Sequence, residues 1–367
     1  MKPHSSACAL FFYAAVVCFS TAQLSGCSST QPQDTAVITI PAADAHIARM
    51  GRTHTNSDQS LTFGFPGVSF KADVVGTSLS ATLYSSAGNS WVDVIVDGGP
   101  AKAIKINREP TAIELFAFPT SGKHSVELVH RSENWHGSVN LQNFTLKGET
   151  FLPAPLLSKR KLLVLGDSVT CGEAIDRVAG EEKNTRWWNA RESYGMLTAQ
   201  MLYAQVNLVC WGGRGLVRSW NGKTDDANLP DFYEFAVGDS DPAMKWDHSQ
   251  YQPDLIVSAI GTNDFSQGIP AREAYVTAYV KFINKLLADH PQAQIALTEG
   301  AILNGEKKAA LIDYIREAIS RVNNARVHQV TSAHYPGDTQ DAHPTKAQHA
   351  AMAKDLAPQL KALMNWQ

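Results

Sequence analysis

The stretch KLLVLGDSVTCG, residues 161–172, decides the fold of the C-terminal half, because an apolar strand runs directly into a turn that carries Ser168. Similar short apolar runs follow at QVNLVC, PDLIVSAIG, AQIALT and ARVHQVT, and segments with helical spacing separate them. Buried strands that alternate with helices are typical of a parallel sheet covered on both faces. We therefore expect residues 160–367 to form an α/β domain with a parallel five-stranded sheet.

Helices are expected between these strands, where apolar residues recur at intervals of three or four. The first begins at about Ser193, and the last opens at Pro344, a residue suited to the first helical turn. Two more helices carry apolar positions that would face the sheet: Val276, Tyr279, Ile283 and Leu286 in one, and Leu311, Ile315, Ile319 and Val322 in the other.

The N-terminal half has a period of two instead. In WVDVIVDGG, Val92, Val94 and Val96 share one face, and an Asp-Gly-Gly turn follows. LSATLYS and HSVELVH repeat the alternation, with Gly, Pro and Ser between the runs. The pattern predicts an antiparallel β-sandwich over residues 36–152, joined to the α/β domain by the proline-containing linker FLPAPLLSKR.

The first residues are typical of a targeting segment rather than of a fold. Lys2 precedes the apolar run ACALFFYAAVVCF, which is shorter than a membrane span, and LSGC follows, ending at Cys27. This order resembles a bacterial lipoprotein signal in which Cys27 is lipidated, with an ordinary secretory signal cleaved nearby as the alternative. We predict a signal peptide at residues 1–27, a polar tether at 28–35, and a location in the bacterial cell envelope. In the envelope the chain would be either anchored to the outer membrane by its lipid or secreted.

The overall composition bounds the partners. The chain has 367 residues, 44% hydrophobic and 18% charged, with a net charge of −3. That balance describes a globular protein and gives no electrostatic footprint for nucleic acid. We expect no nucleic-acid partner, and membrane contact only through the lipid anchor.

Two of the five cysteines, Cys171 and Cys210, lie inside the expected α/β domain. They could pair in an oxidising envelope, but buried free thiols are the favoured interpretation. No metal-ligand spacing surrounds either one, so we expect no metal site there.

The ends of the strands carry the chemistry, because ligands bind at the carboxyl edge of such sheets. GDS ends the first strand at Ser168, WGGRG follows the second, GTND follows the third, and DAHPT follows the fifth. A serine hydroxyl needs a base within hydrogen-bond reach, and His343, held before a proline, is the candidate. Asp341 lies two residues earlier and would point the same way in an extended segment, where it would orient the imidazole.

An oxyanion needs preorganised donors facing it. The backbone N–H of Ser168 is one candidate. The N–H of Gly213 is a second, because a residue without a Cβ permits close approach. The side-chain amide of Asn263 is a third. Each motif alone has a plainer explanation as turn chemistry, and their joint placement at strand ends favours a hydrolase.

Four tryptophans lie near the expected crevice and are candidates for stacking on a substrate: Trp187, Trp188, Trp211 and Trp220. Burial in a core or a domain interface is the commoner outcome for a tryptophan, so these four are candidates only. Arg214 would contact the substrate or pair with an acid in its loop.

The ordered set of GDS, a glycine turn, GTND and DxHP resembles the SGNH (GDSL-type) hydrolase superfamily. A sandwich followed by GDSVTCG, ESYG, WDHSQYQPDLIVSAIGTNDF and DAHPTKAQHAAMA is further similar to carbohydrate esterase family 2, from about residue 40 to the end. The resemblance implies a jelly-roll domain, a flavodoxin-like SGNH domain, and removal of O-acetyl groups from plant polysaccharides such as xylan and glucomannan. With a polysaccharide substrate, the tryptophans near the crevice would form a sugar platform and Arg214 would contact a sugar hydroxyl. No cofactor is expected.

Two departures accompany the resemblance. Most of the superfamily places the aspartate three positions before the histidine, where this chain has Gln340. The family 2 pattern places the aspartate two positions before the histidine, as Asp341 is here. Some members orient the histidine with a backbone carbonyl instead, so either group could orient His343. The segment EAIDRVAGEEKNTRWWNA also replaces the usual glycine-rich turn after the nucleophile.

The expected function is a serine acetyl esterase acting on acetylated polysaccharide or oligosaccharide through an acetyl-serine intermediate. The alternatives are a lipase, thioesterase or acyltransferase built from the same residues, and a surface lipoprotein that binds carbohydrate without turnover. The role of the sandwich is open between sugar binding and bracing of the crevice.

Overall fold

The computed structural model describes residues 36–238 and 244–367, which belong to one compact unit. The predicted signal peptide, Cys27 and the tether lie outside the described residues. Among the described residues, no helix has both the length and the apolar character that a bilayer crossing requires.

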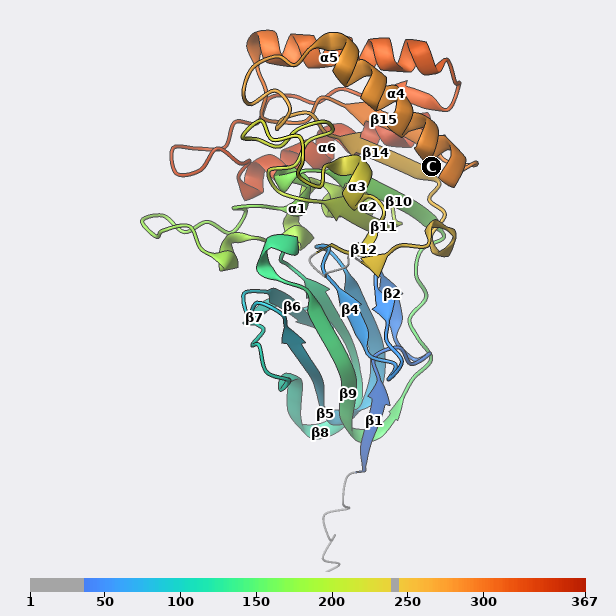
Figure 1. Cartoon of the computed structure of the whole chain (residues 1–367). Helices are drawn as coiled ribbons and strands as arrows, with labels where there is room; N and C mark the ends of the chain where they lie inside the picture. The colour runs from blue at the N-terminus through green and yellow to red at the C-terminus, as the bar shows by residue number, and fades with distance from the viewer. Residues whose placement is uncertain (1–35, 239–243) are drawn as a thin grey trace, which may run out of the picture. The chain divides into compact units, whose positions relative to one another are not determined.

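The N-terminal half is an antiparallel β structure, as the period of two predicts (Figure 1). Its strands are β1 (Val37–Pro41), β2 (Ala48–Met50), β3 (His54–Thr55), β4 (Leu61–Phe63), β5 (Ser69–Ser85), β6 (Trp91–Val96), β7 (Lys102–Lys105), β8 (Thr111–His130) and β9 (Val139–Phe151). They pair in the order β3-β4-β9-β5-β8-β6-β7, with β1 on β9 and β2 on β5. The long strands β5 and β8 shift register after Gly76, so that both bend and wrap one core.

The alternation seen in the sequence sorts side chains between that core and solvent. Val92 and Val94 are buried on β6, whereas Val96 is only partly buried beside the turn. Asp97 and Gly98 are the central residues of a turn closed by a hydrogen bond from the Gly99 N–H to the Val96 carbonyl (2.8 Å), and both have positive φ (51° and 69°), as a type I′ turn requires.

The C-terminal half contains a parallel sheet of five strands: β10 (Arg160–Gly166), β11 (Ala204–Cys210), β14 (Leu255–Ala259), β15 (Gln294–Thr298) and β16 (Val327–Gln329). Their order is β11-β10-β14-β15-β16, which is the flavodoxin-like order. The expected fold, a sandwich followed by a flavodoxin-like α/β domain, is therefore confirmed.

Each central strand buries both of its faces. On β10, Leu163 and Leu165 enter one core with α4 (Arg272–Asp289) and α5 (Gly305–Val322), while Leu162 and Val164 enter another with α2 (Tyr194–Met201) and α6 (Lys346–Leu363). Full burial of such a side chain stabilises the fold by roughly 2 kcal/mol. The last helix begins at Lys346 rather than Pro344, because the Thr345 hydroxyl and Gln348 form a capping box.

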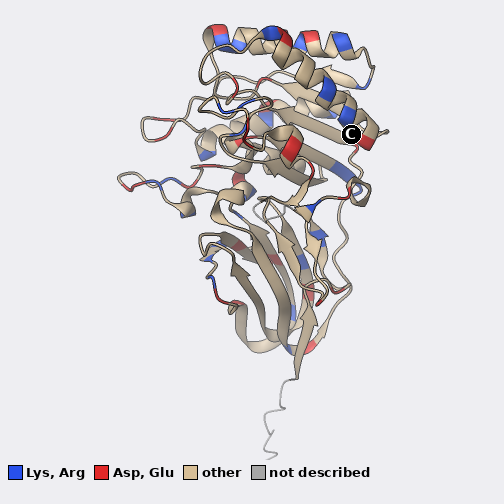
Figure 2. Cartoon of the chain, viewed as in Figure 1, with Lys and Arg blue, Asp and Glu red and all other residues tan. Residues whose placement is uncertain are grey.

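Shorter elements complete this half: α1 (Ser168–Cys171), α3 (Leu229–Phe232), β12 (Phe235–Val237), β13 (Met244–Lys245) and the 3₁₀ turns η2 (Thr185–Trp187), η3 (Ala190–Glu192) and η4 (His248–Gln250). The outer helices α4 and α5 carry interspersed charges of both signs (Figure 2). Arg321 pairs with Glu273 (2.6 Å) and Arg272 with Glu317 (2.8 Å), which ties these two helices together.

Buried arginines join the two halves. The Arg52 guanidinium donates to the carbonyls of Tyr233 (2.6 Å) and Phe235 (2.8 Å), and burial lowers its pKa to about 9. Arg131, at the end of β8, pairs with Asp93 (2.7 Å) and with Asp176 (2.6 Å) of the other half. Breaking such a buried pair leaves an uncompensated charge, so the two halves are firmly fastened at this junction.

The expectation of free thiols is wrong: Cys171 and Cys210 form a disulfide. Cys171 ends α1 and Cys210 ends β11, beside the Gly166 end of β10, so the topology brings their Cα atoms to 5.7 Å. Sequence spacing alone cannot show this proximity, because 39 positions separate the two residues.

Candidate active site

Ser168, His343 and Asp341 lie in one hydrogen-bonded chain. The Ser168 Oγ is 2.9 Å from His343 Nε2, and His343 Nδ1 is 2.6 Å from Asp341 Oδ1. Imidazole can accept a proton from the serine only if its other nitrogen carries one, and the carboxylate favours that tautomer. The structure therefore places Asp341, rather than a backbone carbonyl, at Nδ1.

The turn that raises Ser168 depends on its neighbours. A Cβ at Gly166 would clash with the Thr170 hydroxyl, so only glycine permits α1 to start directly at the strand end. Asp167 caps α1 by accepting from the N–H of Val169 (3.1 Å), and burial raises the pKa of Asp167 to about 6. These contacts fix the serine between β10 and α1.

Arg177 holds the loop that carries the histidine. Its guanidinium donates to the carbonyl of Asp341 (2.7 Å), to the carboxylate of Asp338 (2.8 Å) and to the carbonyl of His343. Arg177 comes from the segment that follows the nucleophile helix, so this atypical segment determines the position of the base.

The same segment supplies charge around Asp341. Lys183 Nζ donates to Asp341 Oδ2 (2.8 Å) and pairs with Glu173, whose other oxygen lies 3.5 Å from His343 Nε2. Burial alone would raise the pKa of Asp341, but hydrogen bonds from His343 and Lys183 outweigh it and hold that pKa well below its usual range. Asp341 is therefore ionised at neutral pH.

The three expected oxyanion donors line the same cleft. Among the described residues, the N–H groups of Ser168 and Gly213 donate to no acceptor. Asn263 uses one N–H to bind the Arg214 carbonyl (2.8 Å), which orients the amide and leaves its second N–H available. Asp264 anchors the adjacent loop by accepting from the backbone of Leu216 (2.8 Å) and two further residues.

The cleft around these groups has a volume of about 510 Å³. Its lining comes from both halves of the chain: Glu133, Trp135, His136, Ser168, Glu173, Trp188, Gly212, Gly213, Trp220, Asn263 and His343. Trp220 and Trp135 leave 58% and 54% of their surface exposed, and such faces suit the apolar face of a sugar ring.

The aromatic candidates divide into two groups. Trp220 and Trp188 line the cleft, as expected. Trp187 is buried in a small core, and Trp211 packs against Trp135 and Phe232; neither lines the cleft. For Trp187 and Trp211 the structure therefore shows burial, the other outcome open to these candidates.

Arg214 likewise does not line the cleft. It pairs with Asp226, donates to Ser219 Oγ (3.1 Å), and its guanidinium lies over the ring of Trp135 at 5.0 Å. Of the two roles expected for Arg214, the structure thus shows pairing with an acid in its own loop. Its flat cation supports the exposed Trp135.

Sequence reasoning missed the residues that come from the sandwich. These residues lie a few positions beyond the end of the long strand β8: Trp135 and His136 in the turn η1 (Asn134–His136), and Glu133 just before it. The available signal was the cluster SENWHG, in which charged and aromatic residues replace the alternating pattern at a strand end. Glu173 was also missed, because its segment has no familiar motif.

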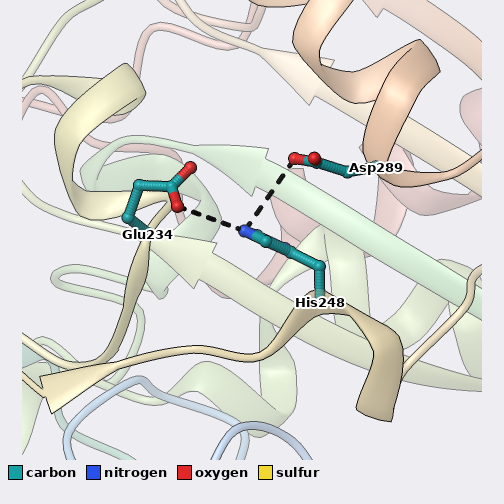
Figure 3. A group of neighbouring side chains, drawn as sticks. All are labelled: Glu234, His248 and Asp289. Atoms are coloured by element: carbon teal, nitrogen blue, oxygen red, sulfur yellow. Dashed lines mark ion pairs between the residues drawn. The ribbon is translucent and has the colours of Figure 1, made fainter.

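A second group of titratable side chains lies outside the cleft (Figure 3). His248 Nε2 is 3.6 Å from Glu234 and 3.9 Å from Asp289. The ammonium of Lys285 pairs with both carboxylates, at 2.9 and 3.1 Å, and Tyr233 donates to Asp289. A lysine already supplies the positive charge here, so we interpret the group as a structural ion-pair network that fastens α4 to the preceding loops.

Comparison with known proteins matches both halves of the chain. Residues 49–155 match the family described as "Carbohydrate esterase 2 N-terminal", and residues 164–357 match the "GDSL-like Lipase/Acylhydrolase family". A protein of Cellvibrio japonicus named "Acetylxylan esterase / glucomannan deacetylase" is 64% identical over 343 residues, which covers 94% of this chain and 96% of that protein.

Comparison with solved structures finds the same family as the sequence comparison. A family two carbohydrate esterase from Cellvibrio japonicus superposes with a TM-score of 0.89 at 64% identity, covering 90% of this chain and 99% of that one. A family two carbohydrate esterase from Clostridium thermocellum, solved with cellohexaose, gives a TM-score of 0.82 at 28% identity, covering 88% and 100%. With its catalytic constellation and both halves matched over nearly their full length, the chain belongs to carbohydrate esterase family 2.

Proposed function

We propose that this protein is a serine esterase that removes O-acetyl groups from plant cell-wall polysaccharides, such as xylan and glucomannan, or from oligosaccharides derived from them. The observation that carries the proposal is the contact of 2.9 Å between Ser168 Oγ and His343 Nε2. In the same cleft, the N–H groups of Ser168 and Gly213 find no acceptor among the described residues. The similarity to the Cellvibrio japonicus protein supports the substrate class.

Acylation begins when Ser168 Oγ attacks the acetyl carbonyl carbon and its proton passes to His343 Nε2. The developing oxyanion accepts hydrogen bonds from the N–H groups of Ser168 and Gly213 and from the Asn263 amide. Asp341 stabilises the imidazolium that forms. The tetrahedral intermediate then collapses, the sugar oxygen leaves with the proton from His343, and Ser168 remains acetylated.

Deacylation repeats these steps with water as the nucleophile. His343 takes a proton from the water, hydroxide adds to the acetyl carbon, and the same donors hold the oxyanion. Release of acetate returns the proton to Ser168 Oγ. The complete cycle consumes one water molecule per acetyl group and regenerates free Ser168 and neutral His343.

The decisive experiment follows acetate release from acetylated xylan and acetylated glucomannan. Ser168→Ala should reduce turnover to the level of the buffer, whereas Ser121→Ala, at an exposed serine on β8, should retain it. The same enzyme should hydrolyse 4-nitrophenyl acetate far faster than the octanoate. Equal rates on the two esters would favour a lipase, and retained turnover in Ser168→Ala would refute the mechanism.

We further propose that the chain is exported and held in the cell envelope through a lipid on Cys27. The charged Lys2, the apolar run and the LSGC sequence support this proposal, and a disulfide between Cys171 and Cys210 suits an oxidising compartment. Wild-type protein expressed in a Gram-negative host should sediment with membranes and incorporate labelled palmitate. Cys27→Ala should do neither, and a soluble, unlabelled wild type would contradict the anchor.

A further inference from the structure

The turn that carries the oxyanion donor is held by the other half of the chain. Residues 211–214 form a β-turn closed by a hydrogen bond from the Arg214 N–H to the Trp211 carbonyl (3.3 Å). Gly213 stands third in this turn with a φ of 75°, the positive value that a type II turn requires there. The central peptide group therefore contains the Gly212 carbonyl and the Gly213 N–H.

Two adjacent glycines leave this peptide group little intrinsic preference. Types I and II turns differ by a flip of the central peptide, and a glycine in both central positions permits either form. In a trans peptide the N–H and the carbonyl point in opposite directions. A flip of the central peptide would therefore exchange the positions of the Gly212 carbonyl and the Gly213 N–H, and the N–H would then point out of the opposite face of the turn. Something outside the turn must select one orientation.

Side chains from the sandwich provide that selection. The Glu133 carboxyl accepts from the Gly212 N–H at 2.6 Å, and the Trp135 indole N–H donates to the Gly212 carbonyl at 3.0 Å. Both polar atoms of Gly212 are thus bound to residues next to β8. A Cβ on Gly212 would lie 2.7 Å from Glu133 Oε1, so the close approach itself requires glycine.

Glu133 is itself held in place. Its side chain is fully buried, and its other oxygen accepts from the Trp188 indole N–H at 2.7 Å. The guanidinium of Arg214 supports Trp135 from one side, and Trp211 packs against it edge-on. Neither side chain is free to release Gly212 without breaking these contacts.

We propose that Glu133 and Trp135 are positioning residues for the reaction, acting through Gly212 to aim the Gly213 N–H at the oxyanion. The proposal rests on the esterase function proposed above and deepens it, because it makes the sandwich a working part of the catalytic machinery. The exposed face of Trp135 can still contact a sugar, but the positioning effect acts through the Gly213 donor, so it should also appear with an ester that has a small leaving group.

The test uses the full chain and two substrates, 4-nitrophenyl acetate and acetylated xylan. Trp135→Phe removes the N–H and keeps an aromatic ring at a half-exposed site, so it should fold. The Glu133 carboxyl accepts from the N–H groups of Gly212 and Trp188. Glu133→Gln replaces one of its oxygens by an NH₂ group, which would face one of these two donors. Each variant should lower kcat about tenfold to a hundredfold on both substrates, with KM for 4-nitrophenyl acetate unchanged, as expected for a misplaced donor.

The matched control is Glu127→Gln on the preceding strand β8, where the carboxylate pairs with Lys71 and lies outside the cleft. It should keep the wild-type kcat, and thermal unfolding should show that Trp135→Phe remains folded. Wild-type kcat in Trp135→Phe and Glu133→Gln would overturn the proposal. So would a loss confined to xylan or to KM, since either would mark a substrate contact.

Failure of this proposal is distinguishable from failure of the esterase function. If Ser168→Ala retains hydrolysis of 4-nitrophenyl acetate, the esterase mechanism fails and this proposal fails with it. If Ser168→Ala abolishes hydrolysis while Glu133→Gln and Trp135→Phe keep full kcat, only the positioning role is wrong.

Discussion

Asp341 Oδ1 lies 2.6 Å from His343 Nδ1, the ring nitrogen that does not contact Ser168. Although only one residue separates them, the carboxylate reaches the imidazole because it also accepts from the His343 backbone N–H at 2.9 Å. A two-residue offset is therefore sufficient for a complete Ser-His-Asp chain in this loop.

The first prediction concerns that carboxylate. Asp341→Asn keeps the shape but offers the Nδ1 proton a neutral partner and permits the wrong tautomer. We expect kcat on 4-nitrophenyl acetate to fall by about 10² to 10⁴ with little change in KM. Asp313→Asn, at an exposed position on α5, serves as the control and should leave both constants unchanged. Near-wild-type kcat in Asp341→Asn would show that another group orients the imidazole.

The second prediction concerns alkaline pH. Burial, and then repulsion from Glu173, raises the pKa of Glu133 to about 8, although Lys183 and hydrogen bonds from Gly212 and Trp188 oppose the shift. Glu133 is therefore neutral below that pH and gains a negative charge above it, close to the glycine turn, where the charge opposes an oxyanion.

We expect kcat on 4-nitrophenyl acetate to decline as pH rises through about 8, after subtraction of buffer hydrolysis. Glu133→Gln cannot ionise, so the decline should disappear from its pH profile. His136, the titratable neighbour on η1, has its pKa lowered by burial to about 4 and stays neutral throughout this range. An unchanged alkaline limb in the variant would assign the decline to another group.

The third prediction concerns acid. Burial lowers the pKa of His130 to about 4 from its usual 6.5, while its Nδ1 contacts the Phe65 carbonyl at 2.9 Å. Between these pH values the His130 imidazole is protonated in the unfolded chain but neutral in the native state. The free energy of unfolding therefore falls as the pH falls.

From pH 6.5 to 4 the expected loss at this site is on the order of 2 to 3 kcal/mol. Urea unfolding at a series of pH values measures it. His130→Asn should be less stable overall but should show a shallower dependence on pH in this interval. A slope identical to the wild type would mean that His130 is protonated in the native state.

The fourth prediction concerns the disulfide. Because Cys171 and Cys210 close a loop with a separation of 39 residues, replacing both by alanine should lower the free energy of unfolding by about 3 to 4 kcal/mol. A reductant should lower the melting temperature of the wild type and leave that of the double variant unchanged. If reductant has no effect on the wild type, the two thiols are not paired in solution.

Much of the site was predictable because strand order and strand ends follow from local patterns. Ser168, Gly213, Asn263 and His343 lie at the carboxyl edge of the sheet, where alternating strands and helices place them. Their convergence is a property of the topology and needs no knowledge of distant side-chain contacts.

The remaining features depend on contacts between distant parts of the chain. Glu133 meets Gly212 across 79 positions, and nothing in either local sequence reveals the other. The pairing of Cys171 with Cys210 and the burial of Trp211 likewise depend on which side of a turn each side chain takes. Periodicity identifies the elements, whereas the packing between the two halves decides these outcomes.

The missing Cβ of Gly212 bears on how such enzymes can be recombined. A hydrolase half grafted onto a foreign sandwich would keep its nucleophile and base, yet the glycine turn would lose the acidic side chain that fills the space beside it. Productive gene fusions should therefore transfer the two halves together, as one inherited unit.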